Sequence, residues 1–147
     1  MAHSTPAPDG PRRLSVLLYS DDITTRDAVR AAAGRRPTRE LEIASWRECA
    51  TAPAVIEAVE SERFDLLILD GEATPAGGLG LTRQLKNEIY NCPPVLVLTG
   101  RPQDVWLAAW SLADAAVPQP LDPLALCLGI KQAIASAPAP GPEPAIL

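Results

Sequence analysis

Short apolar runs alternate along this chain with segments in which apolar residues recur every three or four positions. Runs that are apolar without alternation indicate strands buried on both faces, and recurrence at helical spacing indicates amphipathic helices. Parallel strands need crossover connections, which helices usually supply. The pattern therefore predicts an α/β domain of three layers, α/β/α, with helices on both faces of a five-stranded parallel sheet. The predicted strands are residues 14–19, 41–45, 64–69, 95–98 and 115–117.

The predicted helices begin and end at residues with suitable capping chemistry. Asp22, Thr51 and Asp122 can each accept a hydrogen bond from the first turn of a following helix. Gly34 is placed to end the first helix. Five helices are therefore expected. They are residues 23–33, 51–63 and 81–89, a helix that Pro102 opens, and residues 122–134.

Length and composition favour one folded domain between two tails. At 147 residues, with 47% hydrophobic content, the chain can bury one core but is too short for a second domain of usual size. Residues 1–13 and 136–147 are rich in proline and alanine, so both are expected to be tails around a domain at residues 14–135. No apolar run approaches the roughly 20 residues that cross a bilayer. This favours a soluble cytoplasmic protein without direct membrane insertion.

Charge and residue content exclude several classes of function. The net charge of -5 and the pI near 4.8 oppose binding to a phosphate backbone, so no nucleic acid is expected as a partner. The three cysteines are scattered and odd in number, which argues against a zinc site or a disulfide framework. His3 is the only histidine and lies in the expected N-terminal tail. Catalysis by a histidine base and multi-histidine metal sites are therefore disfavoured.

Polar residues gather at the predicted carboxyl ends of the strands. Asp21 and Asp22 follow the first strand, whereas Asp70 follows the third. Thr99 follows the fourth. Ligand sites of open parallel sheets form outside these strand ends. Carboxylates gathered there repel one another unless a cation intervenes, and hard oxygen ligands suit magnesium, so the sequence predicts a pocket for magnesium and a phosphoryl group.

In their types and order, these residues resemble the receiver domain of bacterial response regulators, over the whole of the expected domain. The resemblance implies a flavodoxin-like fold with strand order 2-1-3-4-5. It implies that Asp70 accepts the phosphoryl group and that the hydroxyl of Thr99 senses it. Asp21, Asp22 and Asp70 would bind magnesium, and the backbone carbonyl of Glu72 would complete the metal site. Formation of an acyl phosphate on a carboxylate depends on neutralisation of the phosphoryl oxygens.

Three positions depart from the pattern of typical receivers. Gln119 stands where the family has a lysine, so the expected cation is missing. A lost charge-assisted contact costs about 1.5 to 3 kcal/mol, which predicts weaker phosphorylation and weakened magnesium binding. Ala116 takes the place of the aromatic switch residue, and Pro118 removes a strand donor. These departures weaken the expected signal path from Thr99.

Two functions therefore stay open, and neither is enzymatic. In the first, the chain is an atypical single-domain response regulator without an output domain, phosphorylated on Asp70 and acting by protein binding. In the alternative, it is a pseudo-receiver that docks, independently of phosphorylation, as an accessory subunit of a larger assembly. A phosphatase of the aspartyl-phosphate type is disfavoured, because Glu72 stands where that enzyme needs a second aspartate.

Two tryptophans are candidates for partner binding. Trp106 and Trp110 lie four residues apart, on one face of a predicted helix. They either pack on the sheet or form a docking face, since tryptophan is enriched in interface hot spots. Partial exposure of both rings would favour docking.

A narrower resemblance concerns the identity of the partner. Residues 70–75 and 92–102 are most similar to orphan receivers of mycobacteria and related actinobacteria. This implies association with the respiratory NADH dehydrogenase of complex I type, peripheral to the membrane. Receiver membership also implies a histidine kinase as a partner. We expect the chain itself to be a monomer or weak dimer.

Overall fold

The computed structural model describes residues 10–101 and 104–136 and contains one parallel sheet of five strands. The strands are β1 (Arg12–Tyr19), β2 (Leu41–Cys49), β3 (Leu66–Asp70), β4 (Val95–Thr99) and β5 (Ala115–Pro118). Their order across the sheet is β2-β1-β3-β4-β5. The predicted flavodoxin-like topology is therefore confirmed. This order makes β1, β3 and β4 neighbours, so the strands that carry the candidate site residues end side by side.

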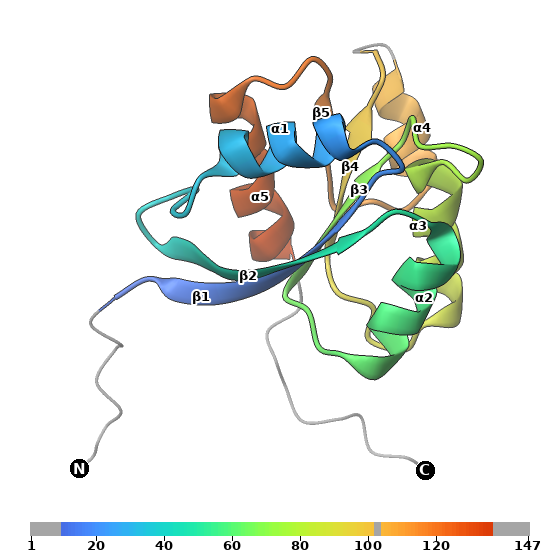
Figure 1. Cartoon of the computed structure of the whole chain (residues 1–147), viewed down its shortest axis with the longest axis horizontal. Helices are drawn as coiled ribbons and strands as arrows, with labels where there is room; N and C mark the ends of the chain where they lie inside the picture. The colour runs from blue at the N-terminus through green and yellow to red at the C-terminus, as the bar shows by residue number, and fades with distance from the viewer. Residues whose placement is uncertain (1–9, 102–103, 137–147) are drawn as a thin grey trace.

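Helices cover both faces of the sheet (Figure 1). The helices are α1 (Ile23–Ala33), α2 (Ala52–Ser61), α3 (Gly78–Glu88), α4 (Val105–Trp110) and α5 (Pro123–Ser136). The buried side chains of α1 and α5 share one core cluster with alternate residues of β1, β3 and β4. Those of α2, α3 and α4 belong to a second cluster on the opposite face. The three predicted layers are thus α1 with α5, the sheet, and α2 with α3 and α4.

The central strands are apolar on both faces because both faces are covered. Within β1, Leu14, Val16 and Leu18 contribute to the cluster beneath α1 and α5. Leu17 and Tyr19 point to the other cluster, as side chains of a strand alternate between faces. All five residues of β3 are buried, and so are all five of β4. Continuous apolar runs in the sequence therefore mark the interior strands correctly.

The edge strand β2 is longer than its apolar pattern predicts. The sequence indicates a strand at residues 41–45, whereas the strand continues to Cys49. Polar residues hold this extension, because Glu48 pairs with Arg26 at 2.9 Å and Arg47 pairs with Glu62 at 3.2 Å. Ion pairs at the edge leave no alternating apolar signal, so the sequence could not reveal the full strand.

The ends of the domain also differ from the expectation. Arg12 and Arg13, assigned to the N-terminal tail, belong to β1, where the Arg12 amide donates to the Glu40 carbonyl at 2.8 Å. Ser136, assigned to the C-terminal tail, is the last residue of α5. The remainder of both expected tails, residues 1–9 and 137–147, lies outside the described residues.

Two further observations concern the helices. Pro102, the expected start of the fourth helix, lies outside the described residues, and α4 begins at Val105. Among the helices of residues 10–101 and 104–136, none has the length and apolar character needed to cross a lipid bilayer.

Candidate functional site

Asp70 is the last residue of β3, and only 4% of its surface is exposed. Strand register determines which residues surround it. Tyr19 of β1 pairs with Leu69, so the next residue along, Ser20, comes to lie beside Asp70. On the other side, Leu98 of β4 pairs with Asp70, which places Thr99 at the same sheet edge. The predicted convergence of strand ends at Asp70 is therefore present.

Three donors hold the carboxylate of Asp70. Ser20 Oγ donates to Oδ2 at 2.8 Å, and the backbone amide of Glu72 donates to Oδ1 at 2.8 Å. Gln119 Nε2 also donates to Oδ1, at 3.1 Å. All three donors are neutral. No ion pair within the described part of the chain involves Asp70, so hydrogen bonds alone satisfy this buried charge.

Ser20 is a site residue that the sequence reasoning missed. Its side chain is fully buried, and besides donating to Asp70 its hydroxyl accepts from the Asp22 amide at 3.1 Å. Its carbonyl accepts from Arg26 Nη1 at 2.7 Å, which fixes the turn between β1 and α1. Two carboxylates follow this hydroxyl directly in the sequence and are the stronger chemical signal. The signal that could have identified Ser20 is register, since a residue directly after β1 must neighbour the end of β3.

Asp21 contacts the loop after β3 rather than Asp70. Its carboxylate accepts from the Thr74 amide at 3.2 Å and from Thr74 Oγ1 at 3.0 Å. These bonds stabilise the charged form and lower the pKa of Asp21 below its usual value. The Tyr19 hydroxyl donates to the Ala76 carbonyl at 2.6 Å and tethers the same loop. Burial and the charges of Asp21 and Asp70 raise the pKa of Tyr19, so it remains a donor at neutral pH.

Asp22 acts as the N-cap of α1. Its Oδ1 accepts from the Thr24 amide at 2.8 Å, and its backbone is extended, as is usual for a capping residue. The structure thus separates the roles of the two neighbouring aspartates. Asp22 caps a helix, and Asp21 holds a loop.

The carboxylates at this sheet edge are the candidate ligands for magnesium. Asp21, Asp22 and Asp70 were the predicted carboxylate ligands, but each accepts from different neutral donors. Within residues 10–101 and 104–136, no group of three acidic, histidine or cysteine side chains is arranged to hold a metal ion. The carbonyl of Glu72 stays a predicted ligand. The three predicted carboxylates therefore do not form one cluster in the described part of the chain, and magnesium binding stays a prediction from the family resemblance.

Glycine allows the loop after β3 to fold tightly over Asp70. A Cβ on Gly78, the first residue of α3, would lie 2.7 Å from the Asp70 carbonyl oxygen, which no other residue type could accommodate without a shift. The Glu72 side chain lies against Gly100, after β4, where a Cβ would collide with its carboxylate. The loop therefore packs closely on the backbone at the ends of β3 and β4.

Thr99 has a different environment from the other site residues. It is the last residue of β4 and is almost completely buried. Among the described residues, its Oγ1 is the one buried side-chain polar atom without a hydrogen-bond partner. A buried hydroxyl without a partner costs free energy, so this position favours an additional acceptor or donor.

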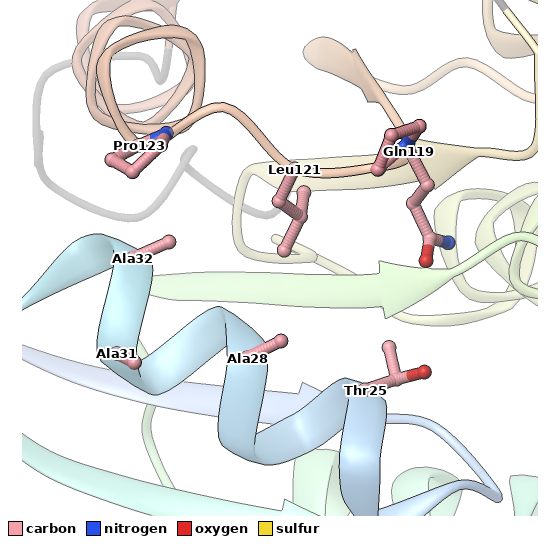
Figure 2. Close-up of a pocket in the computed structure, with 8 residues that line it drawn as sticks. Thr25, Ala28, Ala31, Ala32, Gln119, Leu121 and Pro123 are labelled. Atoms are coloured by element: carbon pink, nitrogen blue, oxygen red, sulfur yellow. The ribbon is translucent and has the colours of Figure 1, made fainter.

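Gln119 connects the site to a cavity. Its backbone N–H donates to the Thr99 carbonyl at 2.8 Å, which fixes the residue after the end of β5. Gln119 also lines a cavity of about 520 Å³ between α1 and the segment that leads into α5. Figure 2 shows Thr25 and Ala28 of α1 facing Gln119 and Leu121 across this space. The residue at the lysine position thus joins Asp70, Thr99 and the cavity wall.

The two tryptophans of α4 are both partly exposed. Trp106 is 67% exposed and Trp110 is 49% exposed. Arg83 of α3 lies over the Trp110 ring at 4.7 Å from its centroid, and its Nη1 donates to the Trp110 carbonyl at 2.6 Å. Ala116 of β5, at the aromatic switch position, is half buried and packs on the core beneath α4. Both rings are therefore partly exposed, which favours a docking face over packing on the sheet.

Comparison with known proteins identifies relatives of this chain. No protein-family model matches it. An uncharacterized response regulatory protein of Mycobacterium tuberculosis strain H37Rv is 52% identical over 119 residues, which cover 81% of this chain and 90% of that protein. The corresponding protein of strain CDC 1551 matches to the same extent.

Solved structures of receivers share the fold at low sequence identity. The receiver domain of a Francisella response regulator superposes with a TM-score of 0.68 at 14% identity, covering 83% of this chain and 97% of that one. A CheY-like receiver of Methanospirillum hungatei has a TM-score of 0.63 at 22% identity, with coverages of 86% and 96%. NtrX of Brucella abortus has a TM-score of 0.69 at 19% identity; 86% of this chain matches, but it spans only 28% of NtrX.

Proposed function

The chain belongs to the response regulator receiver family, and we propose that it acts by binding a protein partner without phosphorylation of Asp70. Receivers are signalling domains, and the fold here is theirs. The observation that carries the proposal is the closure of Asp70 by Ser20, the Glu72 amide and Gln119. Both carboxylate oxygens already accept hydrogen bonds. Oδ1 accepts two hydrogen bonds and Oδ2 accepts one, so the unphosphorylated carboxylate is stabilised in its present position.

The neutral character of the donors supports the proposal further. Phosphoryl transfer depends on positioning and on neutralisation of the negative oxygens of the transferred group. Charge-assisted hydrogen bonds are roughly twice as strong as neutral ones. Ser20 and Gln119 supply a hydroxyl and an amide, neither of which carries a charge. This pocket stabilises a resting carboxylate better than a phosphorylated one.

The docking surface that we assign to the partner is the face of α4. Trp106 and Trp110 are large, exposed and held on a short helix, and tryptophan is strongly enriched at interface hot spots. Arg83 adds a stacked guanidinium at the edge of this surface. A subunit of respiratory complex I and a histidine kinase both stay predicted partners, and the docking account favours the former because it requires no phosphoryl donor.

A second function has one specific observation in its favour. The Thr99 hydroxyl is buried without a partner, and a phosphoryl oxygen on Asp70 would supply an acceptor at this sheet edge. In that case the chain is a phosphorylated receiver, as the family resemblance implies. An ordered water would satisfy the same hydroxyl equally well, so this observation carries less weight than the closure of Asp70.

Partner capture from native lysate tests the proposal. Parent protein and Asp70→Ala are each used with and without beryllofluoride and magnesium. We expect the same partner in all four samples. Capture that needs beryllofluoride, and that Asp70→Ala abolishes, would instead establish the phosphorylated function.

A pair of surface variants tests the assigned docking face in the same assay. Trp106→Ala removes an exposed ring from α4 and is expected to abolish capture. Leu124→Ala is the matched control, since Leu124 is equally exposed at 67% but lies on α5. Equal loss in both variants would show that the α4 face is not the specific surface.

A further inference from the structure

The connection between α4 and β5 passes beside the point where the described chain ends. Trp110 is the last residue of α4, and Asp114 follows four positions later. Asp114 Oδ1 accepts from Ser136 Oγ at 3.3 Å, and Ser136 is the final residue of α5. The segment that follows Ser136 therefore starts beside the connection between α4 and β5. Lys86 of α3 pairs with Asp114 at 2.7 Å and fixes this corner.

The sequence after Ser136 has the composition that aromatic surfaces bind. Residues 137–147 read Ala-Pro-Ala-Pro-Gly-Pro-Glu-Pro-Ala-Ile-Leu, with four prolines in eleven residues. Alternating proline favours the polyproline II conformation, which needs no internal hydrogen bonds and loses little entropy on binding. Aromatic-lined surfaces recognise such segments by stacking proline rings on indole faces. Trp106 and Trp110 offer two such faces, four residues apart.

Reach and charge are both compatible with this contact. Eleven residues in polyproline II span about 34 Å, since each residue advances about 3.1 Å. The six residues of α4 extend about 9 Å. Arg83, stacked over Trp110, uses one guanidinium nitrogen on the Trp110 carbonyl and has further donors. Glu143, between two prolines, is the one acidic residue of the segment and complements that charge.

We propose that residues 137–147 dock on the Trp106 and Trp110 face of their own chain and compete there with a protein partner. The competition rests on the proposed docking function, whereas the contact itself does not. Attachment at Ser136 makes binding intramolecular, and short tethers give effective concentrations of about millimolar. A weak contact is therefore sufficient to cover the face. A partner must displace the segment, which makes the docking surface self-regulated.

The test uses the full chain and the indole N–H resonances of its three tryptophans. One variant replaces Pro138, Pro140, Pro142 and Pro144 by serine. The resonances of Trp106 and Trp110 are expected to shift relative to the parent, independently of protein concentration. Trp46, half buried on β2, is the internal control and is expected to stay in place. Addition of a synthetic peptide of residues 137–147 to this variant should move both shifted resonances back toward the parent positions.

A second variant provides a matched control for the segment. Pro6→Ser with Pro8→Ser changes the other proline-rich end of the chain. The fold begins there with Arg12, whose backbone amide donates to the Glu40 carbonyl and whose side chain pairs with Asp65. This variant is expected to leave all three indole resonances unchanged. Glu143→Gln is expected to produce a partial shift of Trp110, the ring that Arg83 covers.

Three results would overturn the inference. The first is that the Trp106 and Trp110 resonances do not differ between the parent and the four-proline variant. The second is that the Trp46 resonance shifts as much as they do. The third is that the shifts grow with protein concentration. The last would assign the contact to a second copy. Partner capture by the same variant separates the two proposals. Indole shifts without any captured partner would uphold the contact and contradict the proposed docking function.

Discussion

Gln119 Nε2 donates to Asp70 Oδ1 at 3.1 Å across 49 residues of sequence, and this bond joins the end of β5 to the end of β3. β4 lies between these two strands, and the backbone N–H of Gln119 donates to the carbonyl of Thr99, the last residue of β4. An amide at this position satisfies the carboxylate without neutralising it. Ser20 Oγ donates to the other oxygen, Oδ2. The charged carboxylate of Asp70 is thus enclosed by uncharged hydrogen-bond donors, an arrangement that we call closure of Asp70.

The hydrogen bonds that enclose the Asp70 carboxylate predict that Asp70 stabilises the fold. Asp70→Ala removes the acceptor of Ser20, Gln119 and the Glu72 amide, and leaves buried donors unpaired. We expect a loss of about 1 to 3 kcal/mol in the free energy of unfolding, measured by urea denaturation near neutral pH. Asp27→Ala, on the exposed side of α1, is the control and should change stability by less than about 0.5 kcal/mol. A more stable Asp70→Ala would indicate repelling carboxylates instead.

Two glycines in helices predict opposite effects of the same substitution. A Cβ on Gly129 of α5 would lie 2.7 Å from Val117 Cγ2 and 3.1 Å from Leu96 Cδ1. Gly129→Ala should therefore cost about 1 to 3 kcal/mol through overpacking against the sheet. A Cβ on Gly80 of α3 would meet no atom within 4 Å, so Gly80→Ala should add about 0.5 to 1 kcal/mol. Thermal or urea unfolding of both variants measures the difference, and equal effects would contradict the packing of α5.

The loop after β3 predicts a specific dependence on pH. The Thr74 amide and hydroxyl lower the pKa of Asp21 in the folded chain below its ordinary value of 3.8. A depressed folded pKa contributes stability that is present above the unfolded pKa and is lost as pH falls through the folded pKa. Thr74→Val removes the hydroxyl and leaves the amide, so the Asp21 pKa should rise part of the way toward 3.8.

Carboxyl-carbon NMR titration of Asp21 measures this shift directly. The stability difference between the parent and Thr74→Val should be present above about pH 4 and should disappear under more acidic conditions, once Asp21 is protonated in both. An unchanged Asp21 pKa in Thr74→Val would show that the hydroxyl contact does not form in solution.

The fold could be predicted because its signals are local and repeated. Apolar runs without alternation mark β3 and β4, and capping residues such as Asp22 and Thr51 mark the helices. Strand bounds were less accurate where side chains are polar. The end of β2 is held by ion pairs of Arg47 and Glu48, which carry no hydrophobic period.

The candidate site was only partly predictable, because its chemistry depends on register. Asp70, Thr99 and Gln119 were expected at one sheet edge and lie there. Ser20 was missed because acidic residues follow it, and a shift of one residue at a strand end changes which side chain faces the neighbouring strand. The sequence alone does not reveal that Ser20, one position before the acidic pair, is the group that reaches Asp70.

Binding of magnesium and beryllofluoride, followed through the Glu72 amide resonance, tests the central claim most directly, because this amide donates to Asp70. Ser20→Asp combined with Gln119→Lys places a further carboxylate and a cation beside Asp70 and serves as the comparison, with a saturable shift expected. In the parent, we predict no saturable shift of the Glu72 amide. A saturable shift in the parent that Asp70→Ala abolishes would contradict closure of the site and establish Asp70 as a working phosphoryl acceptor.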